Sequence, residues 1–254
     1  MIGVPVPFVQ VRDVNMHYEV IGAGSPMILM VGAMGSIESF EGWMPLGSMF
    51  AEHYRCYFVD HRGHGRTDNP TGAISYAALA EDMAAFIRGM SLDAAIFCGM
   101  SDGAITALEL GLNHGDLVSA LVCVGANYYN DDLVREANQF AEVGNLSADQ
   151  SERWSDAHDR DKPAGYWREL LRQNAENLAI NPSYSQADLQ EIATPTLLIS
   201  GEDDKWANID QMVTMKKNVA ASEMLIVNHA GHNVHATHPE VVGPRILDFL
   251  RRRI

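Results

Sequence analysis

The chain has 254 residues, of which 47% are hydrophobic, enough to bury a sizeable core in one large domain or in a domain with a lid. Its 18 basic and 33 acidic residues give a formal charge of −15, which opposes binding to nucleic acid because such binding needs a basic patch. No apolar run approaches the roughly 20 residues that cross a bilayer, and residues 1–8 lack the pattern of a secretion signal. We therefore expect a cytoplasmic protein with no nucleic-acid or membrane partner.

Stretches typical of strands and of helices alternate along the chain. A hairpin is expected first, from Phe8–Asp13 and Asn15–Val20, and further strands are expected at Met27–Val31, Tyr54–Val59, Ala94–Cys98, Val118–Val124, Thr196–Ser200 and Met224–Val227. The predicted helices are Tyr76–Met90, Ala104–Leu112, Ile209–Val219 and Pro239–Arg252. This alternation predicts an α/β fold: a mostly parallel eight-stranded sheet with helices on both faces and functional loops at the carboxyl ends of the strands.

Residues 130–191, between the sixth and seventh predicted strands, carry helical patterns and no strand. These patterns are Leu133–Val143, a stretch that begins at a capping box of Ser147 and Gln150, and Tyr166–Leu178. An insertion at this position cannot join the sheet without disrupting it, so we expect a lid that excludes water and shapes a pocket. The core is then residues 1–129 and 192–254, and Tyr129 and Trp154 are among the aromatic residues expected to line the pocket.

The strand Ala94–Cys98 runs into the chain's only G-x-S-x-G motif, Gly99–Gly103. The small residues two before and two after the serine let strand and helix approach closely, so that the hydroxyl projects from the turn. A serine hydroxyl becomes a nucleophile when a neighbouring imidazole takes its proton, and a carboxylate orients that imidazole. The motif therefore predicts Ser101 as a nucleophile.

In this type of fold the partners of the serine follow it in the order acid, histidine. Asp203 and Asp204 both follow the strand Thr196–Ser200, and His232 follows the next strand in the loop before the last helix. His232 is the predicted general base. His229, His232, His235 and His238 recur at intervals of three, but a strand-to-helix turn separates their directions, so we expect no metal and no other cofactor.

Acyl transfer also needs donors for the oxyanion, each contributing about 3 to 4 kcal/mol when well placed. The backbone N–H of Asp102, directly after the nucleophile, is one predicted donor. The loop Gly32–Ser36 is expected to supply the other from Ala33, with Met34 as the alternative. This loop has neither the G-x-G-x-x-G spacing nor the lysine of a phosphate-binding loop.

Taken together, these residues resemble the α/β-hydrolase family over essentially the whole chain. Within the family, the chain is most similar to the valacyclovir hydrolase, or biphenyl hydrolase-like, group of serine esterases. The matching residues are Gly32–Ser36 with Glu38, Ser101–Gly103 with Ile105–Leu108, Gly125–Asn127 with Tyr129, Trp154–Ser155, Gly201–Glu202 with Asp204, and His232–Asn233 with His235.

The resemblance implies Asp204 as the acid, since the family's acid lies three residues past the glycine that ends this strand. It also implies hydrolysis of α-amino acid esters, with Asp102 holding the substrate ammonium. Met100 stands where the group has a tryptophan and Ala104 where it has a second glycine, which alters the shape of the acyl pocket.

Asp102 also poses an electrostatic question. A carboxylate 4 Å from a developing oxyanion opposes it by about 1 to 4 kcal/mol, so its presence makes sense if a bound cation neutralises it. The alternative is that the side chain points away and complements the positive end of its helix.

The predicted activity is hydrolysis of a small-molecule carboxylic ester by a Ser101–His232–Asp204 triad, with amino acid esters as the specific hypothesis. Met34, Met100, Asp102, Tyr129, Trp154 and Trp206 are the residues expected to contact the substrate. The alternatives are a lactone, enol-lactone or carbon–carbon bond hydrolase on the same scaffold, and a non-catalytic binding protein. The sequence makes no prediction of oligomeric state.

Overall fold

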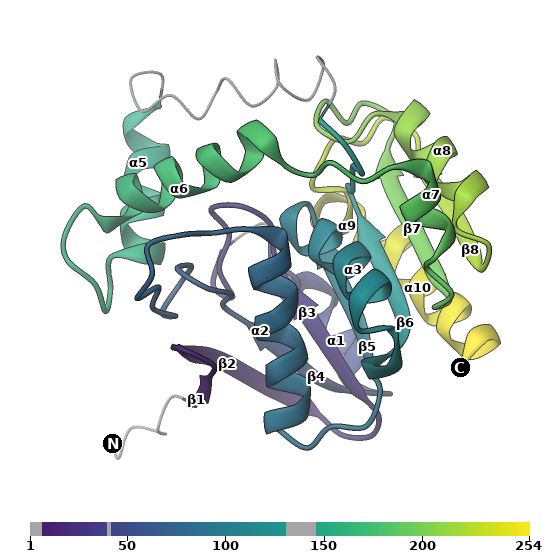
Figure 1. Ribbon diagram of the computed structural model, residues 1–254, viewed down its shortest axis with the longest axis horizontal. Helices are drawn as coiled ribbons and strands as arrows, with labels where there is room; N and C mark the ends of the chain where they lie inside the picture. Colours follow the sequence, from purple (N-terminus) through teal and green to yellow (C-terminus); the bar gives the residue numbers. More distant parts are fainter. Residues whose placement is uncertain (1–6, 40–41, 131–145) are drawn as a thin grey trace.

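The computed structural model describes residues 7–39, 42–130 and 146–254, and in these ranges the chain forms one eight-stranded sheet (Figure 1). Its strands are β1 (Phe8–Val11), β2 (Val14–Gly22), β3 (Pro26–Met30), β4 (Arg55–Val59), β5 (Ala95–Met100), β6 (Val118–Val124), β7 (Thr196–Gly201) and β8 (Ser222–Val227). Their order is β1-β2-β4-β3-β5-β6-β7-β8, antiparallel at β1–β2 and β2–β4 and parallel elsewhere. The predicted mostly parallel sheet is confirmed.

The helices in the described ranges cover the sheet and extend beyond it. They are α1 (Met44–Ala51), α2 (Tyr76–Gly89), α3 (Asp102–Asn113), α5 (Ala148–His158), α6 (Tyr166–Ile180), α7 (Gln186–Gln190), α8 (Ile209–Asn218), α9 (Val234–Thr237) and α10 (Pro239–Arg253), with a 3₁₀ turn at Gly115–Leu117. The four predicted core helices correspond to α2, α3, α8 and α10. Helices α1, α7 and α9 were not predicted, because all three are too short to show a helical hydrophobic period.

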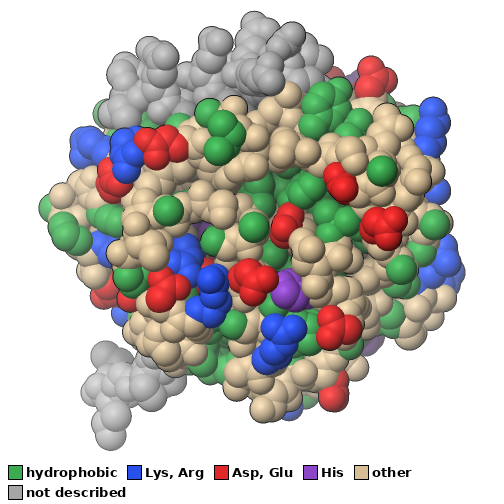
Figure 2. Space-filling view, in the orientation of Figure 1, with side chains coloured by type: hydrophobic (Ala, Val, Ile, Leu, Met, Phe, Trp, Pro, Cys, Tyr) green, Lys and Arg blue, Asp and Glu red, His purple; other side chains and the backbone are tan. Residues whose placement is uncertain are grey.

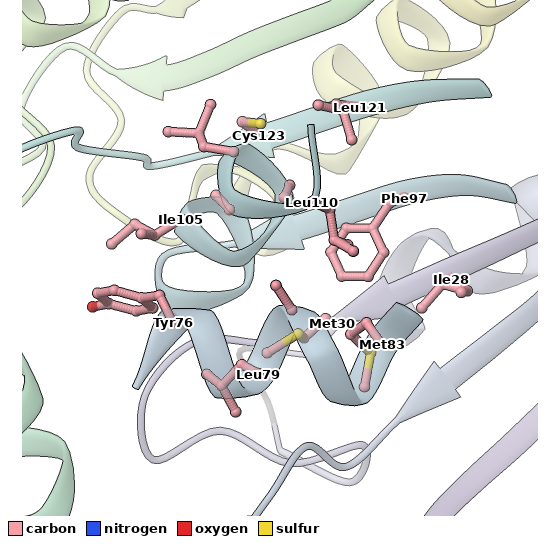
Figure 3. Packing of buried hydrophobic residues seen from close by; sticks show 14 of the residues in the cluster. Ile28, Met30, Tyr76, Leu79, Met83, Phe97, Ile105, Leu110, Leu121 and Cys123 are labelled. Atoms are coloured by element: carbon pink, nitrogen blue, oxygen red, sulfur yellow. The ribbon is translucent and has the colours of Figure 1, made fainter. Parts of the chain in front are cut away.

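Two apolar layers hold these helices to the sheet. Along β3, Ile28 and Met30 join one buried cluster and Met27 and Leu29 the other, as the period of two in a strand requires. The first layer packs under α2 and α3, as Figure 3 shows for side chains of both helices around β3 and β5. The second layer packs under α1 and α10. Both faces of the sheet are therefore covered, and function is left to the ends of the strands.

Helices α5, α6 and α7 follow β6 and precede β7. In Figure 1, α6 lies above the end of the sheet from which α3 starts. Trp167 and Leu170 of α6 are buried in the first apolar layer, so this helix packs firmly on the core. The Ser147 hydroxyl accepts a hydrogen bond of 3.1 Å from the Gln150 N–H at the start of α5, which is one of the two bonds of the predicted capping box. The predicted helix Leu133–Val143 lies outside the described residues.

On the face of the molecule seen in Figure 2, the charged side chains are dispersed. Figure 2 shows acidic and basic side chains interspersed with apolar ones over the face seen in Figure 1. Among the residues that the structure describes, no helix combines the length and the hydrophobicity needed to span a membrane.

Candidate active site

Ser101 occupies a strained turn between β5 and α3. Its backbone has φ 52° and ψ −116°, a conformation that costs a non-glycine residue on the order of 1–3 kcal/mol. A Cβ atom on Gly99 would lie 2.0 Å from the carbonyl oxygen of Gly103, and one on Gly103 would lie 2.5 Å from that of Met30. The two glycines are therefore required by the close approach of strand and helix, which is the geometry of a nucleophile elbow.

The imidazole of His232 is hydrogen-bonded to the carboxylate of Asp204. Its Nδ1 lies 2.9 Å from Oδ1 and 2.8 Å from Oδ2, and the Asp204 side chain is fully buried. The backbone N–H groups of Trp206 and Ala207 also donate to Oδ1, at 2.9 and 3.0 Å. Because a carboxylate accepts from Nδ1–H, Nε2 of His232 is left with its lone pair as a proton acceptor.

The structure resolves the choice of acidic partner geometrically, since it brings Asp204 and not Asp203 to His232. Gly125, at the end of β6, makes room for the ring: its φ is +63°, and a Cβ there would lie 3.0 Å from both Cε1 and Nδ1 of His232. The indole of Trp206 packs against the other side of the site, with its ring centroid 5.0 Å from that of His232. The histidine is thus held by its surroundings in one orientation.

Ser101 and His232 open into the same cavity, whose volume is about 1060 Å³. Of the residues predicted to contact substrate, Met34, Met100, Asp102, Trp154 and Trp206 line this cavity. Tyr129 does not: it lies in a separate hollow with Tyr128, Pro182 and Tyr184, so the structure corrects its predicted position. The backbone of Tyr129 pairs with Ser183 in an isolated antiparallel bridge, which holds this residue beside the segment that follows α6.

The turn predicted to supply an oxyanion donor, Gly32 to Gly35 (called the oxyanion turn below), lies directly against the elbow. The Gly35 N–H donates to the Gly32 carbonyl at 3.1 Å, and Met34 has φ 56°. A Cβ on Gly32 would lie 2.6 Å from Cβ of Ser101, so only glycine allows this contact. The turn leaves the N–H of Ala33 outside its own hydrogen bond, and Asp102, as the first residue of α3, has an N–H without an intrahelical acceptor.

The carboxylate of Asp102 is buried, with 2% of the residue exposed. The Tyr76 hydroxyl donates to Oδ1 at 2.9 Å, while Oδ2 has no hydrogen-bond partner among the described residues. Burial raises the pKa of Asp102 to about 6, although the Tyr76 hydrogen bond acts in the opposite direction. The side chain is therefore held inside the protein at the start of α3, where it both lines the cavity and lies at the positive end of the helix.

Several cavity residues were not predicted from the sequence. The inserted helices contribute Gln150, Arg153, Leu171, Asn174 and Leu178. No motif marks these side chains, because their position depends on how α5 and α6 pack over the sheet. Tyr76 was likewise assigned only to an amphipathic helix, although its hydroxyl is the partner of Asp102.

The histidines at intervals of three point in different directions. His235 is buried with its ring centroid 4.7 Å from that of Trp43, whereas the His229 side chain is largely exposed. Within residues 7–39, 42–130 and 146–254, no group of three histidine, cysteine, aspartate or glutamate side chains is arranged to hold a metal ion.

This fold and site define a hydrolase of the α/β type. Residues 27–244 match the profile of the Alpha/beta hydrolase family, and the chain belongs to that family.

Two curated relatives match over most of their length. A 2-hydroxy-6-oxo-6-(2'-aminophenyl)hexa-2,4-dienoic acid hydrolase of Metapseudomonas resinovorans is 25% identical over 97% of this chain and 91% of its own. A putative carbamate hydrolase RutD of Agrobacterium fabrum is 27% identical over 92% of this chain and 98% of its own. Among solved structures, the enol-lactonase of Burkholderia xenovorans has a TM-score of 0.78 at 21% identity, over 96% of this chain and 100% of that chain. These comparisons leave the valacyclovir hydrolase grouping as a prediction.

Proposed function

We propose that this chain is a serine hydrolase that cleaves carboxylic esters through an acyl-enzyme, with Ser101 as nucleophile, His232 as general base and Asp204 as the orienting acid. The observation that carries the proposal is the Asp204–His232 hydrogen bond, made by an imidazole that shares its cavity with a serine on a strained elbow. A serine that only packed in a turn would need neither the strain nor the fully buried carboxylate behind the histidine.

The chemistry then follows from the positions of these groups. Nε2 of His232 takes the proton of Ser101 as Oγ attacks the carbonyl, and Asp204 stabilises the imidazolium that forms. The N–H groups of Ala33 and Asp102 stabilise the oxyanion. His232 next gives the proton to the leaving alcohol. Water then attacks the acyl-enzyme as Nε2 of His232 takes its proton, the bond between the acyl group and Oγ of Ser101 breaks, and His232 returns the proton to Oγ while the carboxylic acid leaves. Residues 130–191 act as a lid that limits access of bulk water.

The substrate class that we propose is an ester with a free α-amino group. The support is Asp102: a buried carboxylate, adjacent to the nucleophile, with one oxygen unpartnered among the described residues. Leaving a buried acceptor without a partner costs about 1 to 3 kcal/mol or more for a charged group. A substrate ammonium would remove this cost and cancel the repulsion between Asp102 and the oxyanion.

A turnover panel tests both parts of the proposal. It contains p-nitrophenyl esters of increasing acyl length, and aminoacyl esters with a free or a blocked amino group. We expect hydrolysis by the wild type, none above background by Ser101→Ala, and a lower KM for esters with the free amino group. A fluorophosphonate probe that labels Ser101→Ala as fully as the wild type would contradict the role of Ser101.

The named relatives support a second candidate, a lactone, enol-lactone or carbon–carbon bond hydrolase that uses the same residues. The relatives reported above include an enol-lactonase and a hydrolase of a dienoic acid. Poor turnover of all simple aryl esters, together with fluorophosphonate labelling of Ser101, would favour this candidate. Absence of both turnover and labelling would favour a non-catalytic binding protein.

A further inference from the structure

His158, the last residue of α5, connects the lid to the two loops beneath it. It is completely buried. Its Nδ1 lies 2.9 Å from the N–H of Gly65, in the loop after β4, and its Nε2 lies 3.1 Å from the carbonyl oxygen of Met34, in the oxyanion turn. The two contacts join segments 93 and 124 residues away from His158 in the chain.

These partners determine the tautomer of His158. A backbone N–H only donates and a carbonyl oxygen only accepts, so Nδ1 must be the unprotonated nitrogen and Nε2 must carry the hydrogen. Burial lowers the pKa of His158 to about 4, so the ring is neutral near pH 7 and can make both bonds. The bond to Met34 is therefore a donation from the lid into the oxyanion turn.

The hydrogen bond from His158 to Met34 is the first in a chain of hydrogen bonds that passes through two planar peptide groups of the turn. The Met34 carbonyl shares its peptide plane with the Gly35 N–H, which donates to the Gly32 carbonyl at 3.1 Å. The Gly32 carbonyl in turn shares its plane with the Ala33 N–H, and in a trans peptide the two bonds point in opposite directions. Hydrogen bonds in such a chain orient and polarise one another.

We propose that His158 is a positioning residue, which holds the Ala33 N–H in the orientation of an oxyanion donor through the chain His158–Met34 and Gly35–Gly32. The inference rests on the proposed function, since it takes Ala33 as a donor to the oxyanion. It also means that the lid does more than cover substrate, because the last residue of α5 fixes part of the catalytic backbone.

Two substitutions separate the two bonds of His158. The amide of His158→Gln reaches to about the position of Nε2 and can donate to Met34, whereas the shorter amide of His158→Asn reaches only to the position of Nδ1 and can accept from Gly65. Lys162→Gln is the matched control: Nζ of Lys162 binds the carbonyls of Gly63 and Gly65 at 3.2 and 2.6 Å, so it also ties the lid to the loop after β4.

The experiment measures kcat and KM for a p-nitrophenyl ester, the affinity of a boronic acid that forms a tetrahedral adduct with Ser101, and Tm. Removal of a whole oxyanion donor costs 10²- to 10³-fold in kcat, so misalignment of one should cost less. We expect His158→Asn to lower kcat and boronic acid affinity by about tenfold each with KM nearly unchanged. His158→Gln and Lys162→Gln should stay within about threefold of wild type, even if all three variants lose Tm.

A merely structural role would give a different pattern. Equal kcat per active site in His158→Asn and His158→Gln, or a loss of kcat without a loss of boronic acid affinity, would overturn the inference. If His158→Asn does not fold, His158→Met, which fills a similar volume and donates no hydrogen bond, replaces it in the comparison. A wild type that neither turns over the ester nor binds the boronic acid would refute the proposed function as well. An active wild type, together with equal kcat values in His158→Asn and His158→Gln, would refute only the role of His158.

Discussion

Replacement of Asp102 by asparagine should stabilise the fold while it removes a binding group. The pKa of this carboxyl is about 6 in the folded protein, raised by burial, against 3.8 for an ordinary aspartate. At 1.36 kcal/mol per pKa unit, ionisation of Asp102 costs the folded state about 3 kcal/mol above pH 6. Asparagine has a similar shape, carries no charge and can still accept the hydrogen bond from Tyr76.

The sign of the pH dependence follows from proton counting. Between pH 3.8 and 6 the folded state binds more protons at Asp102 than the unfolded state does, so the stability of the wild type falls as pH rises through this window. The stability gain of Asp102→Asn should therefore be near zero below pH 3.8 and reach its full size above pH 6. Urea unfolding of both proteins at pH 4 and pH 8 measures this difference, in which the titrating groups that are not coupled to Asp102 cancel.

A stability gain that does not change between these pH values would refute the argument, because it would mean that the Asp102 carboxyl titrates alike in the folded and unfolded states.

The same variant tests substrate choice. We expect Asp102→Asn to raise KM selectively for esters with a free amino group and to leave the KM of N-blocked esters unchanged. An equal loss on both kinds of ester would remove the ammonium hypothesis while leaving the stability argument intact.

Three further substitutions test other parts of the structure. Gly99→Ala places a methyl group 2.0 Å from the Gly103 carbonyl and should give misfolded or inactive protein, measured by circular dichroism and turnover; an active, folded variant would refute the required closeness of strand and helix. Arg62→Met removes the hydrogen bonds of 2.8 and 2.9 Å that Arg62 donates to the fully buried Asp82, which keeps the contact from the partly exposed Arg12 at 2.9 Å, and should cost about 3 kcal/mol in urea unfolding; a loss below about 1 kcal/mol would contradict this. Asp204→Asn should lower kcat by about 10⁴-fold with the fold retained, by analogy with the measured effect of this change in a serine protease triad, and a loss under tenfold would refute its role.

The sequence predicted the features that depend on local backbone geometry. The elbow could be recognised because only glycine tolerates the contacts at positions 99 and 103, and such a requirement leaves a mark in the sequence itself. The central strands were equally visible as short apolar runs bounded by turns, and β1 and β2 as the two strands of a hairpin. Asp204 and Asp203 could not be separated on local grounds, because both follow the same strand, and only the resemblance favoured Asp204.

The lining of the cavity could be predicted only in part, because it is set by contacts between distant segments. Trp154 and Tyr129 were equally plausible as aromatic residues near the inserted helices. The structure puts Trp154 into the cavity and Tyr129 into a separate hollow. A side chain's direction after the end of a strand depends on the path of the following loop, and no periodic pattern constrains that path.

The contacts of His158 could not be predicted from the sequence for a second reason. Its partners are a backbone N–H and a backbone carbonyl, and every residue except proline offers both, so no residue type in the partner loops could reveal the contact. The contact forms because α5 ends at a buried position between the two loops. There the neutral imidazole of His158 supplies one donor and one acceptor on opposite sides of its ring. In the role that we propose for it, this contact ties the alignment of the oxyanion turn to the packing of α5. The identity of residue 158 would then be constrained by the chemistry as well as by the packing of the inserted helices.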